Sequence, residues 1–402
     1  KGGVWFSLID KVWQRSNLES SFAKVKANQG APGVDGVTVA KFEERLEREM
    51  NRIENQLKQG EYRPDAIRRA WIPKGDGRMR PLGIPTVRDR VVQTALRNVL
   101  EPIFEREFAE HSYGFRPGRG AKDALRRLDQ LLKAGYRHVV DADIQGYFDS
   151  IPQDKLRARL RERIADGRVL SLLDGYLSQP VMESLQTWTP EQGTPQGAVI
   201  SPLLANIYLN PLDHEMASRG MEMVRYADDF VVMCRSRAEA ETAMEVVRVW
   251  MKEAGLCLHP DKTRLVDMET NGSRFEFLGY RFNRWKDRDY RSPRAKSAKK
   301  LKDAIRQHTR RTNGLSMEAT IAAINPILKG WFGYFKHSCR STFPAIDSWV
   351  RMRLRSILRK RAGGRGRGRG SDNQKWPNKF FADCGLFCLE TAYGQAVQSL
   401  RG

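Results

Sequence analysis

Tyr226-Ala227-Asp228-Asp229 interrupts an apolar stretch, with Val224 before it and Phe230-Val231-Val232-Met233-Cys234 after it. The outgoing run is apolar and β-branched, which predicts a buried strand and makes the four residues the turn of a hairpin. Two adjacent carboxylates at the tip of a buried hairpin are costly unless a positive charge meets them. An Asp-rich turn is the simple alternative. A divalent metal ion, which binds carboxylate and phosphate oxygens together, is the interpretation that predicts chemistry.

The composition of the chain indicates a globular protein with a polyanionic partner. Its 402 residues suffice for two or three domains, and 40% of them are hydrophobic. The 70 Lys and Arg residues outnumber the 48 Asp and Glu residues, which gives a formal charge of +22. We expect nucleic acid and no membrane, because no apolar run reaches the roughly 18 to 20 residues of a membrane span. Five scattered cysteines predict no disulfide framework and fit a reducing cytosol.

Strand and helix patterns follow one another without regular alternation, which predicts an α+β fold. We expect a hairpin over 68–84, helices over 87–109 and 154–177, and a strand over 138–144. The last quarter of the chain is basic: 284–311 has twelve basic and three acidic residues, and 351–369 has nine basic residues and no acid. The Arg-Gly tract that begins at 365 predicts a flexible cationic linker, with a solvated surface loop as the alternative.

The strand over 138–144 supplies further carboxylates. Two-metal nucleotidyl transfer needs two or three carboxylates on neighbouring strands, which hold two cations about 4 Å apart. Asp143, at the end of this strand, would meet Asp228 and Asp229 at the hairpin. Asp141 and Asp149 compete with Asp143 on spacing alone, and the residues themselves do not separate the three.

Three blocks of the chain closely resemble the reverse transcriptases encoded by bacterial group II introns. The blocks are Asp143 with Gly146-Tyr147-Phe148-Asp149, the stretch from Gly193-Thr194-Pro195-Gln196-Gly197 to Leu204, and Tyr226-Ala227-Asp228-Asp229. The resemblance runs over nearly the whole chain. It implies that Asp143, Asp228 and Asp229 are catalytic. It also implies two Mg²⁺ ions as the cofactor, bound by Asp143, Asp228 and the carbonyl of Ile144.

The same resemblance implies a deoxynucleotide pocket. Phe148 resembles the steric gate that clashes with a ribose 2′-hydroxyl, although residue type alone favours a core aromatic. For Lys74 and Arg80, which flank the turn at 75–77, a solvated pair of surface charges is the alternative. The implied contacts to the dNTP are Lys74, Arg80, Phe148, Gln196, Gly197 and Lys262.

Further blocks imply contacts with RNA. The loop over 30–35 resembles an N-terminal block that covers the template. Tyr113-Gly114-Phe115-Arg116-Pro117-Gly118-Arg119 resembles a block that implies template phosphate contacts for Arg116 and Arg119, with salt bridges inside the fold as the alternative. Gly330-Trp331-Phe332-Gly333-Tyr334-Phe335 resembles the thumb and maturase region, which binds the parent intron RNA. We expect its aromatic residues in the core.

The resemblance implies the shape of a right-hand polymerase: fingers and a palm with a mixed or antiparallel sheet, followed by a helical thumb. The expected ranges are 1–60 for an N-terminal extension with the template-covering loop, 61–285 for fingers and palm, 286–362 for the thumb and maturase region, and 363–402 for a basic Arg-Gly linker and a short DNA-binding-like tail. The last range has one Cys pair and no His, so we expect no C-terminal endonuclease domain.

The expected function is that of an RNA-directed DNA polymerase that also serves as a splicing maturase and takes part in intron mobility by target-primed reverse transcription. The expected partners are group II intron RNA, an RNA template with a DNA primer, dNTPs and target DNA, in a bacterial cytoplasm near the nucleoid. A host-adopted relative in defence or DNA repair stays open as an alternative. A maturase that only binds RNA is less well supported, because the carboxylates and the Gln196-Gly197 loop are intact.

Overall fold

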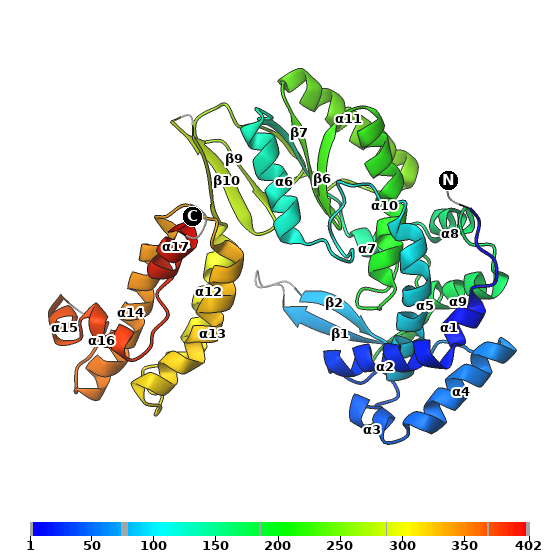
Figure 1. The fold of residues 1–402 in the computed structure, drawn as a ribbon, viewed down its shortest axis with the longest axis horizontal. Helices are drawn as coiled ribbons and strands as arrows, with labels where there is room; N and C mark the ends of the chain where they lie inside the picture. The colour runs from blue at the N-terminus through cyan, green and yellow to red at the C-terminus, as the bar shows by residue number, and fades with distance from the viewer. Residues whose placement is uncertain (1–2, 74–78, 185, 287, 368–369, 399–402) are drawn as a thin grey trace. The chain divides into compact units, whose positions relative to one another are not determined.

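The computed structural model describes residues 3–73, 79–184, 186–286, 288–367 and 370–398 (Figure 1). The chain divides into two compact units, Lys1–Leu265 and Val266–Gly402. The first unit combines helices with two sheets, and the second combines a small sheet with packed helices, so the expected α+β class is confirmed. Among the described residues, no helix is long and apolar enough to cross a membrane.

The central sheet of the first unit contains the predicted hairpin. Its strand order is β6-β7-β3-β8, and its strands are β3 (His138–Asp143), β6 (Glu222–Tyr226), β7 (Asp229–Cys234) and β8 (Arg264–Asp267). Strand β7 is antiparallel to both β3 and β6. Its apolar run from Phe230 to Cys234 is buried throughout, as a central strand with both faces covered requires. The predictions of this hairpin and of the strand over 138–144 are therefore confirmed.

Helices cover this sheet and continue its core. Helix α11 (Arg237–Ala254) packs against β3 and β7, while α6 (Ala121–Lys133) and α10 (Ser201–Ser218) pack against β6 (Figure 1). Helix α5 (Val87–Glu105) buries the apolar face that the sequence predicted over 87–109. Helices α5, α10 and α11 share one hydrophobic core with residues of the sheet.

The helix expected over 154–177 is interrupted. It consists of α8 (Gln153–Arg161) and α9 (Gly167–Leu177). Asp166 caps α9 by accepting hydrogen bonds from the backbone N–H groups of Arg168 and Val169 at 3.0 and 3.1 Å. Its second oxygen accepts from the N–H groups of Leu8 and Ile9 at 2.6 and 2.8 Å. This carboxylate therefore starts α9 and holds the N-terminal segment.

A second sheet in the first unit has the order β2-β1-β4-β5. Strands β1 (Ile67–Pro73) and β2 (Met79–Ile84) form the antiparallel hairpin predicted over 68–84, and β1 also pairs in parallel with β4 (Val181–Glu183), which pairs with β5 (Gln186–Trp188). The remaining helices of this unit are α1 (Ile9–Trp13), α2 (Arg15–Asn28), α3 (Val39–Glu43), α4 (Leu46–Gln59) and the short α7 (Tyr147–Ser150).

The second unit joins a three-stranded sheet to helices. The sheet order is β11-β10-β9, from β9 (Arg274–Phe277), β10 (Tyr280–Trp285) and β11 (Arg288–Pro293). The helices are α12 (Ala295–His308), α13 (Met317–Phe335), α14 (Thr342–Arg361), α15 (Gly370–Lys375), α16 (Asn378–Asp383) and α17 (Leu389–Gln398). Phe332 and Phe335 are buried, as expected for core aromatics. Phe381 and Leu389 are fully buried in the helical core as well, so part of the C-terminal range 363–402 is integral to this unit.

Candidate active site

The hairpin and the neighbouring strand bring three carboxylates to one end of the central sheet. Asp143 is the last residue of β3 and lies opposite Asp229, the first residue of β7. Ala227 and Asp228 form the two-residue turn between β6 and β7. The pair of Tyr226 with Asp229 closes this turn. The strand register thus collects the three residues that were expected to act together.

The two competing carboxylates have other surroundings. Asp141 lies opposite Val231, two residues along β3 from Asp143, and forms an ion pair with Arg264 at 3.3 Å. Asp149 lies in α7 and accepts a hydrogen bond from the side-chain amide of Gln196 at 2.7 Å. Neither residue sits at the turn that carries Asp228.

The ionised carboxylate of Asp228 is in unfavourable surroundings unless a cation lies near it. Burial raises the pKa of its carboxyl, and the charge of Asp143 raises it further, against opposing contributions that include Arg80 and Arg225. Lys262 forms an ion pair with Asp143, in which Nζ lies 2.6 Å from Oδ2. Clustered carboxylate oxygens are the ligands that hard divalent cations prefer. The type of donor therefore fits the Mg²⁺ ions that the family resemblance implies.

Lys262 reaches Asp143 because the segment before β8 runs beside the end of β3. The backbone N–H of His259 donates to the carbonyl of Asp143 at 2.8 Å. Ile144 forms an antiparallel bridge with Leu258, and its side chain is buried. A role for the carbonyl of Ile144 in metal binding stays a prediction.

A buried arginine supports the turn from beneath. Arg225 in β6 is fully buried, and its guanidinium binds both carboxylate oxygens of Asp213 in α10, at 2.7 and 2.5 Å. Its Nη1 also donates to the carbonyl oxygen of Ala227 at 2.8 Å. Ala227 has a φ of 59°, a left-handed conformation that a non-glycine residue adopts at a cost. The only sequence signal for this support is an arginine inside an otherwise apolar strand.

The block around Gly114 lies directly against the same turn. A Cβ atom at Gly114 would lie 2.3 Å from the backbone nitrogen of Ala227, so only glycine fits there. Asn206 donates to the carbonyl of Gly114 at 2.8 Å and accepts from Arg225 at 3.0 Å. The turn, this block and α10 therefore form one hydrogen-bonded assembly.

Phe148 lies beside the loop that begins at Gly193. The backbone N–H of Thr194 donates to the carbonyl of Phe148 at 2.7 Å. Gly193 has a φ of 86°, and a Cβ atom there would lie 2.7 Å from the same carbonyl oxygen. The side chain of Phe148 is only partly buried. The side chain is thus partly accessible while its backbone is fixed.

The end of that loop joins the β1–β2 hairpin. The backbone N–H of Gly83 donates to the carbonyl of Gln196 at 2.6 Å, and a Cβ atom at Gly197 would lie 2.3 Å from the carbonyl oxygen of Gly83. The side-chain amide of Gln196 accepts from Nε of Arg80 at 3.0 Å and donates to Asp149. Arg80, Gln196 and Gly197, three of the predicted dNTP contacts, therefore lie together.

The remaining residues with predicted contacts to the dNTP or RNA lie in different surroundings. Lys74 lies outside the described residues. Arg116 is buried, and its guanidinium binds Glu105 at 2.7 Å. This geometry favours the salt bridge inside the fold that the sequence left open as the alternative to a phosphate contact. Arg119 is partly exposed and donates to the carbonyl of Glu110 at 2.5 Å, which leaves part of its guanidinium accessible.

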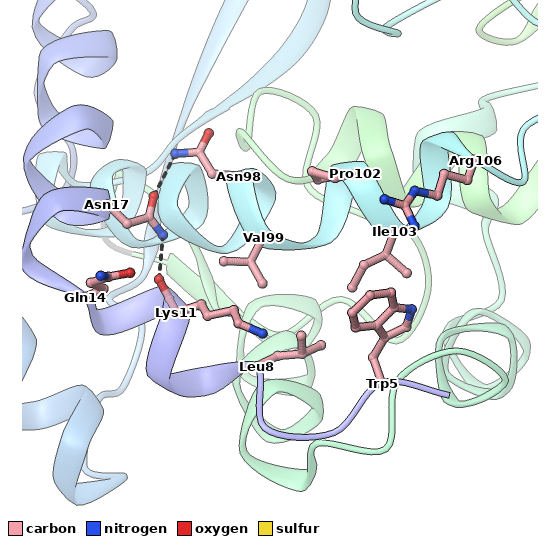
Figure 2. Close-up of a pocket in the computed structure, with 10 residues that line it drawn as sticks. All are labelled: Trp5, Leu8, Lys11, Gln14, Asn17, Asn98, Val99, Pro102, Ile103 and Arg106. Atoms are coloured by element: carbon pink, nitrogen blue, oxygen red, sulfur yellow. Dashed lines mark hydrogen bonds between the residues drawn. The ribbon is translucent and has the colours of Figure 1, made fainter. Parts of the chain in front are cut away.

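A separate cavity of about 450 Å³ lies among the N-terminal segment, α1, α2 and α5 (Figure 2). Asn17 closes its polar edge by donating to the carbonyl of Lys11 at 2.9 Å and accepting from the amide of Asn98 at 2.9 Å. It contains none of the predicted site residues. Its lining consists of Trp5, Leu8, Lys11, Gln14, Asn17, Asn98, Val99, Pro102, Ile103 and Arg106.

Two family descriptions match the chain. Residues 72–282 match the reverse transcriptase (RNA-dependent DNA polymerase) family, and residues 298–375 match the group II intron maturase-specific domain. The first match covers the carboxylates, the loop from Gly193 and strand β2. The second begins within α12 and ends at α15.

Three curated relatives are similar to parts of this chain. Protein YkfC of Escherichia coli is 34% identical over 322 residues, which cover 70% of this chain and 84% of that protein. The group II intron-encoded protein LtrA of Lactococcus lactis is 40% identical over 168 residues, which cover 42% of this chain and 28% of LtrA. An uncharacterized 91 kDa protein in the cob intron of Schizosaccharomyces pombe is 30% identical over 289 residues, which cover 57% of this chain and 35% of that protein.

Proposed function

Because this chain belongs to the group II intron family of reverse transcriptases and maturases, we propose that it copies RNA into DNA at Asp143, Asp228 and Asp229 and binds intron RNA through its second unit. Membership of the family identifies the chain as an RNA-directed DNA polymerase and implies a divalent metal and nucleic-acid substrates. The residue roles, the two Mg²⁺ ions and the particular partners are the proposal.

The observation that carries the polymerase site is the register that sets Asp143 opposite Asp229, beside Asp228. Two Mg²⁺ ions held by these carboxylates would activate the 3′-hydroxyl of the primer and stabilise the leaving pyrophosphate. The carboxylates supply oxygen donors, and the Arg225 support holds the turn in place before any ligand arrives. Preorganisation of this kind avoids rearrangement at the moment of reaction.

The surrounding cations and the Gly197 loop supply the nucleotide pocket. Arg80 is exposed beside Gln196, so its charge is available to a triphosphate. Lys262 pairs with Asp143 and is proposed to meet the leaving pyrophosphate. Phe148, whose side chain is only partly buried, is proposed to exclude the 2′-hydroxyl of a ribonucleotide.

The second unit carries the proposed contact with intron RNA. Burial lowers the pKa of Arg353, and the positive charges of Arg306, Arg311 and Arg367 lower it further. These four residues are called here the arginine cluster, in which the other three charges repel that of Arg353. RNA phosphates would relieve that repulsion. Intron mobility by target-primed synthesis, with target DNA as a further partner, is part of the same proposal.

The test is primer extension on an RNA template with dNTPs and Mg²⁺, in which wild type is compared with Asp228→Ala. We expect extension by wild type only, with intron RNA bound by both proteins within a few-fold. Asp141→Ala is the matched control, because it removes a carboxylate of the neighbouring strand β3 that lies away from the turn. Extension by folded Asp228→Ala would contradict the site, and equal loss of RNA binding would contradict the division between the two units.

A further inference from the structure

A third aromatic ring lies between Phe148 and the carboxylate turn. The ring centroid of Phe115 is 6.4 Å from that of Phe148, in an edge-to-face arrangement, and 6.4 Å from that of Tyr226. Both distances fall within the range of interacting aromatic pairs. Phe148 is the proposed steric gate, and Tyr226 closes the turn that carries Asp228. Phe115 is therefore the side chain that links the gate to the turn.

The conformation of Phe115 is not explained by its own burial. Its φ is 58°, in the left-handed region that bulky residues avoid. Its side chain is nevertheless 41% exposed. The backbone strain costs free energy, and the exposed part of the ring gains little from burial. Such strain concentrates at sites where function requires it.

Neighbours on both sides hold Phe115 in this conformation. Before it, the backbone N–H of Tyr113 donates to the carbonyl of Arg225 at 2.9 Å, and Gly114 lies against Ala227. After it, Arg116 is buried and bound to Glu105. The backbone that carries the ring is therefore fixed on both sides.

We propose that Phe115 is a positioning residue for sugar selection. Its ring bears on Phe148 and keeps that ring turned toward C2′ of the incoming nucleotide. Without Phe115, the ring of Phe148 would rotate into the vacated space and the 2′-hydroxyl would meet no obstacle. This inference rests on the proposed polymerase function and on the gate role of Phe148, and it requires no contact of Phe115 with the substrate.

The test is incorporation of a single nucleotide opposite a template guanine in RNA, with kcat/KM measured for dCTP and for CTP. We expect Phe115→Ala and Phe115→Gly to lower the preference for dCTP by about tenfold or more, mainly through a lower KM for CTP. Phe115→Tyr keeps both ring contacts and should keep the preference. Phe6→Ala, at an aromatic residue that is 68% exposed in the N-terminal segment, is the matched control and should not change it.

Phe115→Gly separates positioning from stability, since glycine relieves the strain that alanine retains. We expect a higher unfolding temperature for Phe115→Gly than for Phe115→Ala, with the same loss of preference. Loss of preference that follows the unfolding temperature would overturn the proposal. The double variant of Phe115→Ala with Phe148→Ala should be no more permissive than Phe148→Ala alone, and additive effects would likewise overturn it.

The variants also distinguish this inference from the proposed function. If Phe148→Ala relaxes selection and both Phe115 variants do not, the role of Phe115 alone is overturned. If Phe148→Ala leaves selection unchanged, the gate assignment fails and the inference fails with it. Absence of any DNA synthesis by folded wild type would overturn the polymerase function itself.

Discussion

Arg225 donates a hydrogen bond of 2.8 Å to the carbonyl oxygen of Ala227, the residue immediately before Asp228. Its guanidinium also binds Asp213, and neither of these two charged side chains is exposed. The position of the Asp228 carboxylate thus depends on an ion pair inside the protein. Such a pair is strongly destabilising when one member is removed, because the other is left as an uncompensated buried charge.

Asp213→Ala is therefore expected to destabilise the first unit by about 3–5 kcal/mol and to abolish DNA synthesis. Chemical denaturation and primer extension would measure the two effects. Glu215→Ala is the matched control on the same helix, because its pair with Arg219 is exposed and is worth less than about 1 kcal/mol. A similar loss of unfolding free energy in the two variants would show that the buried pair stabilises the unit no more than the exposed pair does.

This support could not have been predicted from the sequence, whereas the hairpin with Asp228 and Asp229 could; the choice of Asp143 over Asp141 and Asp149 came from the family resemblance. The hairpin and the end of β3 follow from local alternation and turn chemistry, which are visible in a short window. The partner of Arg225 lies on another element, and the burial of both depends on tertiary packing. The same reason applies to Asp166, which caps α9 inside the range 154–177 where periodicity predicted one helix, and which also binds the distant Leu8 and Ile9.

Residue type alone also did not decide whether Arg116 binds a phosphate or forms a salt bridge inside the fold. An arginine in a basic chain suits a phosphate as well as a carboxylate, and only burial beside Glu105 separates the two. For the arginine cluster the composition predicted a polyanion, but not that one of its members is partly buried. Charge patterns in the sequence therefore predicted the class of partner, and packing was needed to say which arginines remain available to it.

Gly197→Ala is expected to weaken nucleotide binding more than stability. Gly197 has a φ of 106°, and Gly220 has a φ of 69°, so alanine brings backbone strain of about 1–2 kcal/mol at either position. Only at Gly197 does the new Cβ also meet a carbonyl oxygen, at 2.3 Å, whereas it meets nothing within 4 Å at Gly220. We expect the KM for dNTPs to rise by about tenfold or more in Gly197→Ala alone. Equal KM values for the two variants would contradict the placement of this loop against the nucleotide.

Mg²⁺ is expected to stabilise wild type through the clustered carboxylates. A ligand that binds only the folded state adds about 2.7 kcal/mol at a concentration of 100 times its Kd. Thermal unfolding in EDTA and in Mg²⁺ would measure this gain. We expect it to vanish in Asp228→Asn and to persist in Asp141→Asn, which alters a carboxylate paired with Arg264. A gain that survives Asp228→Asn would place the ion elsewhere.

The stability of the first unit is expected to depend on pH through Asp89. This carboxyl on α5 is fully buried, and burial raises its pKa from the ordinary value of 3.8 to about 6, although hydrogen bonds from Tyr62 and Thr86 oppose the shift. Because the folded state holds the proton more tightly, the stability that this group contributes is present below pH 3.8 and is lost as the pH rises to about 6. The loss is about 3 kcal/mol relative to Asp89→Asn. If the free energy of unfolding of wild type and of Asp89→Asn changed in parallel between these pH values, Asp89 would not be the source of the pH dependence.

Arg311→Gln tests the arginine cluster without weakening the fold. Arg311 is exposed, and its charge disfavours that of the partly buried Arg353, so its removal should leave the unfolding temperature unchanged or slightly higher. If the cluster binds phosphates, the variant should bind intron RNA less tightly, and the slope of log K against log salt should fall by about one. Arg237→Gln, at an exposed arginine of α11 that pairs with Glu241, is the control and should keep the slope. An unchanged slope in Arg311→Gln would remove this residue from the proposed RNA contact.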